Sequence, residues 1–182
     1  MPLPKRVLGP DAAGLALTKY SGVDSNADAA DHAGGKTTAA SLARAGRITG
    51  YTLDFASPDP GRRLLEVQTI AELYRSETSA AKGLLFWRGV TSRLNGTTGN
   101  GISTSAVPFT AHVGDGAFAF ELTYRHAGEP VAYVGDVVFR TRTLLGAVFV
   151  TARDEAGVRA RTVRLARALE ARIRQVLAGK IR

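Results

Sequence analysis

The second half of the chain contains four consecutive strand-like segments joined by very short connections. Residues 107–113, 117–126, 131–140 and 144–151 are rich in Val, Phe, Tyr and Thr. At residues 114–116 the connection is only Gly-Asp-Gly. Because a parallel return needs a crossover of a dozen or more residues, strands joined in this way pair antiparallel. This order excludes a doubly wound nucleotide-binding sheet and indicates an α+β domain.

Two earlier segments, 48–56 and 64–74, alternate between apolar and polar residues. The alternation predicts a hairpin with one face toward water. In the second segment Glu66, Gln68 and Glu72 are expected on that wet face.

Helices are expected to cover both faces of the sheet. A helix is predicted over 77–94 and another over about 155–178. Segments 131–140 and 144–150 are apolar on both sides, which is typical of central strands covered on both faces. Gly83, in mid-helix, indicates a close approach of that helix to the sheet. The predicted fold is therefore α+β, with a mostly antiparallel sheet of about six strands flanked by helices.

We expect residues 1–182 to form a single domain with a genuine core. Residues 1–45 are expected to be a partly flexible arm, with a mobile loop over 21–35 and a short helix over 37–45. No apolar run approaches the ~18 residues of a membrane helix. The first six residues lack the apolar core of a signal peptide, so the protein is expected either to be cytoplasmic or to follow a removed leader. Cysteine is absent, which excludes a disulfide framework and a thiol nucleophile.

The positive charge is concentrated at the end of the chain. The net charge is +8, and residues 153–182 hold nine Lys and Arg against three acidic residues. Arg164, Arg167 and Arg174 are expected opposite the apolar stripe of the last helix. They are candidates for binding an anionic partner surface, whereas a simple solvated face is the alternative. Nucleic acid is not a favoured partner, because this helix lacks aromatic residues for base stacking.

Few residues form patterns that suggest chemistry. Residues 30–37 resemble a phosphate-binding loop, but the polar segment before them cannot form the required buried strand. His112 and Asp115 could form a base and its orienting group, although Asp115 also suits the turn. Asp136 is predicted to lie on an apolar face, where a carboxylate needs a partner such as an arginine. The histidines have no metal-ligand spacing, and no cofactor is indicated.

Three stretches of sequence carry a family resemblance. They are 45–51 (Ala-Gly-Arg-Ile-Thr-Gly-Tyr), 113–117 (Val-Gly-Asp-Gly-Ala) and the hairpin formed by 136–140 and 144–150. Together they resemble secreted actinobacterial proteins of the PsbP-like group, which includes LpqN-type lipoproteins and the extracellular sensor domain of PknH-type kinases. The resemblance implies an antiparallel sheet between helices, an exported cell-envelope location and a non-enzymatic binding or sensing role. The chain departs from the kinase sensor by lacking its paired cysteines. A nuclear-transport-factor-like cone is the alternative fold.

The favoured function is non-enzymatic binding of a small apolar ligand or an envelope partner in a cleft between the sheet and the helix 77–94. One alternative is a protein-interaction module that uses Leu85 and Phe86 or the arginine-rich helix. Another is a hydrolase or isomerase built on Asp136 or His112. The predicted ligand-binding residues are Tyr51, Trp87, Phe118, Phe120, Tyr133 and Asp136.

Overall fold

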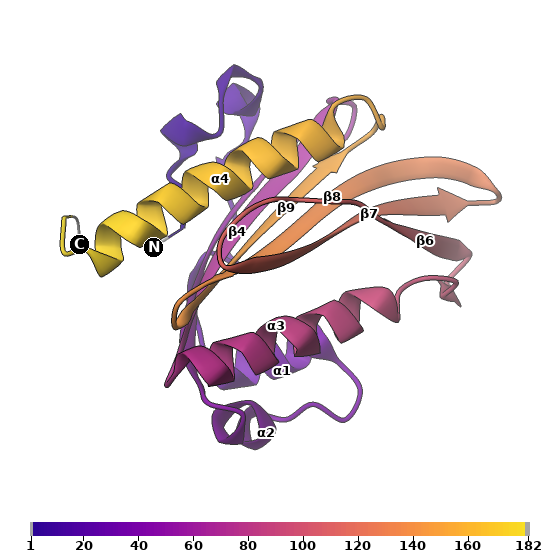
Figure 1. The fold of residues 1–182 in the computed structure, drawn as a ribbon. Coiled ribbons are helices and arrows are strands. Elements are labelled where there is room, and N and C mark those ends of the chain that lie inside the picture. Colours follow the sequence, from indigo (N-terminus) through magenta and orange to yellow (C-terminus); the bar gives the residue numbers. More distant parts are fainter. Residues whose placement is uncertain (1, 181–182) are drawn as a thin grey trace.

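The computed structural model describes residues 2–180, which form one antiparallel sheet with helices on both faces (Figure 1). The sheet has nine strands in the order β1-β3-β4-β9-β8-β7-β6-β5, and β2 also pairs with β3. The strands are β1 (Ala16–Leu17), β2 (Gly22–Asp24), β3 (Arg47–Ala56), β4 (Leu64–Tyr74), β5 (Thr98–Gly99), β6 (Ile102–Pro108), β7 (Gly116–His126), β8 (Glu129–Thr141) and β9 (Leu144–Ala152). The helices are α1 (Asn26–Ala33), α2 (Ala39–Arg44), α3 (Glu77–Ser92) and α4 (Val158–Leu177), with short 3₁₀ turns η1 (Lys5–Val7) and η2 (Pro10–Gly14).

The predicted α+β class and antiparallel sheet are confirmed. The sheet has nine strands instead of about six, and the additional ones, β1, β2 and β5, are only two or three residues long. The strand expected at 107–113 lies earlier in the chain, as β6. This strand buries a polar residue, Thr104, so its apolar signal is weak.

Each face of the sheet is covered as the apolar central strands require. Helix α4 lies along one face, while α3 and α1 lie across the other (Figure 1). The buried apolar residues of α4 (Val158, Leu165, Ala166, Leu169 and Ile173) pack mainly on β8 and β9. The residues of this larger core include Val67, Val137, Phe139, Val148, Leu165, Leu169 and Ile173.

Two glycines allow helices to approach the sheet closely. A Cβ at Gly135 of β8 would lie 2.1 Å from Thr162 Oγ1 of α4. A Cβ at Gly83 of α3 would lie 2.5 Å from the ring of Tyr74 on β4. Both positions therefore need a residue without a side chain, as the sequence indicated for Gly83.

The supposedly wet face of β4 is covered by protein, so this expectation was wrong. Glu72 is only 6% exposed, whereas Leu73 on the opposite side is 37% exposed. The cause is the helix α1, which the sequence did not predict and which lies beside α3 on this face (Figure 1).

The first 45 residues contain more regular structure than predicted. Where a loop was expected over 21–35, the chain forms β2 and then α1. Ser25 begins α1 with a capping box in which Ser25 and Asp28 bond each other's backbone N–H groups. The predicted short helix is present as α2, which begins after the cap Thr38.

Candidate ligand-binding pocket

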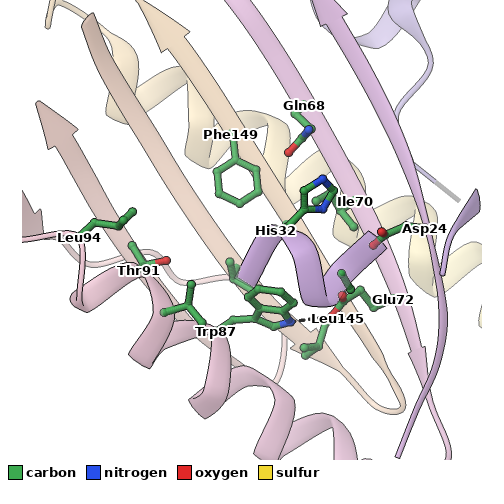
Figure 2. A pocket seen from close by; sticks show the side chains of 14 residues that line it. Asp24, His32, Gln68, Ile70, Glu72, Trp87, Thr91, Leu94, Leu145 and Phe149 are labelled. Atoms are coloured by element: carbon green, nitrogen blue, oxygen red, sulfur yellow. Dashed lines mark hydrogen bonds between the residues drawn. The ribbon is translucent and has the colours of Figure 1, made fainter. Parts of the chain in front are cut away.

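A pocket of about 210 Å³ lies between the sheet and the helices α1 and α3. Figure 2 shows its side chains converging from β4 and β9, from α1 in front of the sheet and from α3 below. It is lined by Asp24, Ala29, His32, Gln68, Ile70, Glu72, Trp87, Val90, Thr91, Leu94, Val138, Leu145, Ala147 and Phe149.

Strand register creates the apolar floor of the pocket. Residues two apart on a strand point to the same face. Ile70 of β4 pairs with Ala147 of β9, which in turn pairs with Val138 of β8. Phe149 extends this floor along β9, and Trp87 of α3 forms a side wall. Most of the surface offered to a ligand is therefore apolar.

A buried ion network closes one end of the pocket. Arg47, at the start of β3, is 1% exposed. Its Nε donates to Glu72 Oε1 at 2.7 Å, and its Nη2 donates to Asp24 Oδ2 at 2.6 Å. Gly50 pairs with Asp24 across β2 and β3 and leaves room for this contact, because a Cβ there would lie 2.6 Å from Arg47 Nη2. Removing one partner of such a buried pair typically costs about 3–5 kcal/mol.

The same network fixes the orientation of Trp87. Glu72 Oε2 accepts hydrogen bonds from Trp87 Nε1 and from the Tyr74 hydroxyl, both at 3.0 Å. Burial of Tyr74, together with the charge of Glu72, raises the pKa of its hydroxyl. The hydroxyl therefore keeps its proton and remains a donor. These bonds hold the indole ring in a fixed position at the pocket wall.

Asp24 is the least satisfied member of the network. Its Oδ2 binds Arg47, but its Oδ1 has no hydrogen-bond partner among the described residues, although Asp24 is only 5% exposed. Burial raises the pKa of Asp24, and the lowering effect of Arg47 does not fully offset it. Asp24 Oδ1 is therefore a buried acceptor without a donor, and it is not open to the pocket.

Asp136 lies just behind the other end of the pocket. It accepts a hydrogen bond from Thr91 Oγ1 at 3.0 Å, and Thr91 lines the pocket. The threonine takes the place of the arginine expected from the sequence. Full burial raises the pKa of Asp136 to about 7. Its Oδ1 has no partner in the part of the chain that the structure describes.

A second carboxyl pair lies on the same face, nearer β1. Burial and the neighbouring charge of Asp54 raise the pKa of Glu66 to about 7. Thr18 Oγ1 donates to Asp54 Oδ2 at 2.5 Å.

The structure brings only part of the predicted ligand-binding set to this pocket. Trp87 lines it, and Asp136 is one hydrogen bond behind it. Phe118 and Phe120 are on the same face of the sheet, but they are packed in a core cluster with Leu84 and Trp87.

Two tyrosines of that set lie elsewhere. Tyr51 has the same orientation as Phe55, which packs in the core under α4, and it is 44% exposed. Tyr133 of β8 pairs with Thr123 of β7. It lies four residues before Val137 on the same strand, so its side chain points to the same face as Val137, which belongs to that core. Both tyrosines therefore belong to the α4 side of the sheet, away from the pocket.

Sequence reasoning missed Asp24, Glu72 and the rest of the α1 side of the pocket. Asp24 was placed in a loop, and Glu72 was expected to face water. The Ser-x-x-Asp spacing at residues 25–28 is the one local signal for α1, since it is a capping box.

The arginines of α4 lie on the outer side of the molecule. Arg164, Arg167 and Arg174 are all exposed. Arg164 Nη2 donates to the carbonyl of Leu8 at 3.1 Å, and Arg174 pairs with Glu170 and Asp115. Two of the three arginines thus have intramolecular contacts besides any role in binding.

The hydrogen bond and ion pairs that the structure gives for Asp115 are made with arginines and not with His112. Asp115 accepts a hydrogen bond from the backbone of Arg142 and lies near the guanidinium groups of Arg140 and Arg174, while His112 is exposed. In the segment 30–37, the first residues belong to α1 and not to a phosphate-binding turn.

Of the apolar pair on α3, Phe86 packs against buried residues of α1 and α2. Leu85 is 66% exposed. The apolar surface that α3 offers to a partner is therefore smaller than the sequence suggested.

Within residues 2–180, no group of three or more His, Cys, Asp or Glu side chains is arranged to hold a metal ion. No helix in this range is long and apolar enough to cross a membrane.

Comparison with known proteins finds a likeness in fold. No family model matches the sequence, and no curated protein matches it. Among solved structures, the chain is similar to the extracellular domain of PknH from Mycobacterium tuberculosis, with a TM-score of 0.63 and 8% sequence identity. The match covers 94% of this chain and 93% of that one. What the two chains have in common is therefore the open antiparallel sheet flanked by helices.

Proposed function

We propose that this protein binds a small, mainly apolar ligand in the pocket between α1, α3 and the sheet, without transforming it. The observation that carries the proposal is the pocket itself, with an apolar floor on three adjacent strands and a Trp87 wall held by Glu72. Ligand sites are commonly preformed apolar hollows with a few fixed polar groups. Here Gln68 and Thr91 supply those groups.

The size of the pocket limits the ligand. A volume of about 210 Å³ is below the ~300–1,000 Å³ of sites for drug-sized molecules. The proposed ligand is therefore a compact molecule or the inserted end of a longer one.

A binding role fits these side chains better than catalysis. The Asp136 carboxyl group is fully buried behind Thr91 and would not reach a bound molecule. His112 is exposed and lies on a segment that does not line the pocket. Neither residue on which the hydrolase or isomerase alternative depends is therefore placed to act on a molecule in this pocket.

We further propose that the protein is exported and works in the cell envelope, within the PsbP-like group that includes LpqN-type lipoproteins. The support is the sequence resemblance and the likeness in fold to the extracellular domain of PknH. Fractionation of the native host, with immunodetection of the protein, tests the location. Recovery in the cytoplasmic fraction alone would contradict it.

Trp87 provides a direct test of ligand binding, because it is the single tryptophan of the chain and lines the pocket. We expect the neutral fluorescent probe N-phenyl-1-naphthylamine to quench Trp87 emission by energy transfer and to bind with saturation. Ala147→Leu should fill the floor of the pocket and weaken probe binding at least tenfold. The matched control Ala160→Leu adds the same side chain to the exposed side of α4 and should leave binding unchanged.

The proposal fails if the probe does not bind, or if Ala147→Leu and Ala160→Leu bind it as well as the unaltered protein. Circular dichroism of both variants establishes that they are folded. Native mass spectrometry of protein purified from its own host then identifies the natural ligand.

A further inference from the structure

We infer that the outer side of α4 is a docking surface for an anionic lipid bilayer. This surface is separate from the proposed ligand pocket, because α4 covers one face of the sheet and α1 and α3 cover the other (Figure 1). A bilayer bound at α4 would leave the pocket directed away from the membrane. Binding at α4 therefore does not depend on what the pocket holds.

The outer side of α4 carries arginines and small residues, without an exposed carboxylate. The exposed residues of this helix are Arg159, Ala160, Arg164, Arg167, Ala171, Arg174, Gln175 and Leu177. Residues 158–180 contain seven Lys and Arg and one Glu, a net charge of +6. Residues 77–93, which include α3, contain three Lys and Arg and one Glu, a net charge of +2. Positive charge is therefore denser on the α4 side of the sheet than along α3.

Two arginines of this surface keep an uncompensated charge. Arg159 donates from Nε and Nη2 to both carboxylate oxygens of Glu121 at 3.0 Å, and Arg174 pairs with Glu170 and Asp115. Arg164 and Arg167 form no ion pair within residues 2–180. The side chain of Arg164 makes one hydrogen bond, from Nη2 to the carbonyl of Leu8 at 3.1 Å. Most of the N–H donors of these two guanidinium groups are therefore left for an external acceptor.

The same two arginines line an open hollow between α4 and the segment that follows β6. Its other lining residues are Phe109, Thr110, Arg159, Ala160 and Val163. The backbone N–H of Phe109 donates to the carbonyl of Ala119 at 3.0 Å, and the guanidinium group of Arg159 lies 5.5 Å from the centre of the Phe109 ring. This wall of the hollow is therefore fixed. Guanidinium groups match the geometry of phosphate oxygens, so the hollow suits the phosphate of a lipid headgroup.

A bilayer fits this surface better than an acidic protein does. Protein partners usually bind through a central aromatic or aliphatic anchor. Along α4, all of which the structure describes, the only exposed large apolar side chain is Leu177, at the last residue of the helix. An anionic bilayer needs no such anchor, because several basic side chains act together on its negative surface potential. The small residues Ala160 and Ala171 between the arginines let a flat surface approach.

Sedimentation with lipid vesicles tests the inference. Vesicles of phosphatidylglycerol and phosphatidylcholine in equal amounts should bind the protein at about 0.1 M salt. Vesicles of phosphatidylcholine alone should bind it at least tenfold more weakly. Binding to the anionic vesicles should also weaken at about 0.5 M salt, because salt screens exposed charges. No binding to anionic vesicles at the lower salt concentration, or equal binding to neutral ones, would overturn the inference.

Two double variants with the same net charge separate the α4 surface from the overall charge of the protein. Arg164→Gln with Arg167→Gln should weaken binding to anionic vesicles at least tenfold. The matched control is Arg88→Gln with Arg93→Gln, at exposed positions of α3 and its end, where neither arginine forms an ion pair within the described residues. It should change binding less than threefold. Equal losses for the two variants would overturn the inference, because net charge alone would then explain binding.

Circular dichroism establishes that both double variants are folded. If the α4 variant does not fold, Arg167→Gln alone replaces it, since the Arg167 side chain makes no hydrogen bond within the described residues. This single variant should weaken binding at least threefold, and unchanged binding would overturn the inference. Poly-glutamate tests the other kind of partner. If it binds more tightly than anionic vesicles and this binding is lost in the α4 variant, the surface belongs to an acidic protein and the bilayer is excluded.

Discussion

At the scale of single residues, Asp136 makes stability depend on pH. The carboxyl group is fully buried, and the lack of water raises its pKa from 3.8 to about 7. Below about pH 3.8 the group is protonated in both the folded and the unfolded protein. Between 3.8 and about 7 the unfolded chain releases the proton and the folded protein keeps it. The free energy of unfolding therefore decreases over this interval, by about 1.4 kcal/mol per pH unit.

We predict that Asp136→Asn removes this dependence. An amide has nearly the shape of the protonated carboxyl group and carries no charge to bury. The variant should have about the stability of the unaltered protein at pH 5 and should be more stable at pH 8. Urea unfolding followed by circular dichroism at pH 5, 6, 7 and 8 measures the difference. Comparing the two proteins at each pH removes the contribution of Glu66, whose pKa is also about 7.

Asp31→Asn is the control for this prediction, since it removes an exposed carboxylate. Its stability relative to the unaltered protein should not change between pH 5 and 8. If the stability of Asp136→Asn relative to the unaltered protein is equally constant between pH 5 and 8, the prediction is wrong, and the Asp136 carboxylate is charged and stabilised in the folded protein.

At the scale of elements, α3 depends on the glycine at its contact with β4. We predict that Gly83→Ala destabilises the protein by about 1–3 kcal/mol, because the new methyl group would lie 2.5 Å from the ring of Tyr74. The clash outweighs the gain of about 1 kcal/mol from the better helix former. It would also disturb the hydrogen bond from Tyr74 to Glu72.

Gly89→Ala is a matched control on the same helix. The nearest atom to its Cβ is Arg93 Nη1 at 3.8 Å, so the methyl group fits and stability should rise by up to about 1 kcal/mol. The free energy of unfolding of both variants is measured with urea. An equal increase for Gly83→Ala and Gly89→Ala would contradict the close packing of α3 on β4.

The elements that could be predicted are those with many large apolar residues at a regular spacing. Strands β7, β8 and β9 and the helix α4 have that pattern, and the sequence located them to within a few residues. Helix α1 buries only Ala29 and Ala30, so its amphipathic signal is weak.

The pocket was less predictable than the fold, because its parts are distant in the sequence. Asp24, Arg47 and Glu72 meet only through the pairing of β2, β3 and β4. A single sequence contains no signal that these three side chains come into contact. Trp87 and Asp136 could be singled out from the sequence because a large aromatic side chain and a carboxylate in an apolar strand are unusual wherever they pack.

At the scale of the whole molecule, the N-terminal arm is part of the main core. Leu3, Leu8 and Leu15 are at most 2% exposed and belong to the cluster under α4. The backbone N–H of Leu3 donates to Thr69 Oγ1 at 3.2 Å, and the carbonyl of Leu8 accepts from Arg164. These contacts connect residues that are more than sixty positions apart. We therefore expect residues 2–180 to unfold as one cooperative unit.

Leu8→Ala tests this expectation, because it removes a buried side chain from the arm while leaving the sheet unchanged. We predict a loss of about 2–5 kcal/mol in the free energy of unfolding. The loss should appear equally in Trp87 fluorescence, which reports on the opposite face of the sheet, and in far-ultraviolet circular dichroism. Leu17→Ala, at a side chain that is 58% exposed, should change stability by no more than about 0.5 kcal/mol. An arm that moves independently would leave the Trp87 transition of Leu8→Ala at the same urea concentration as in the unaltered protein.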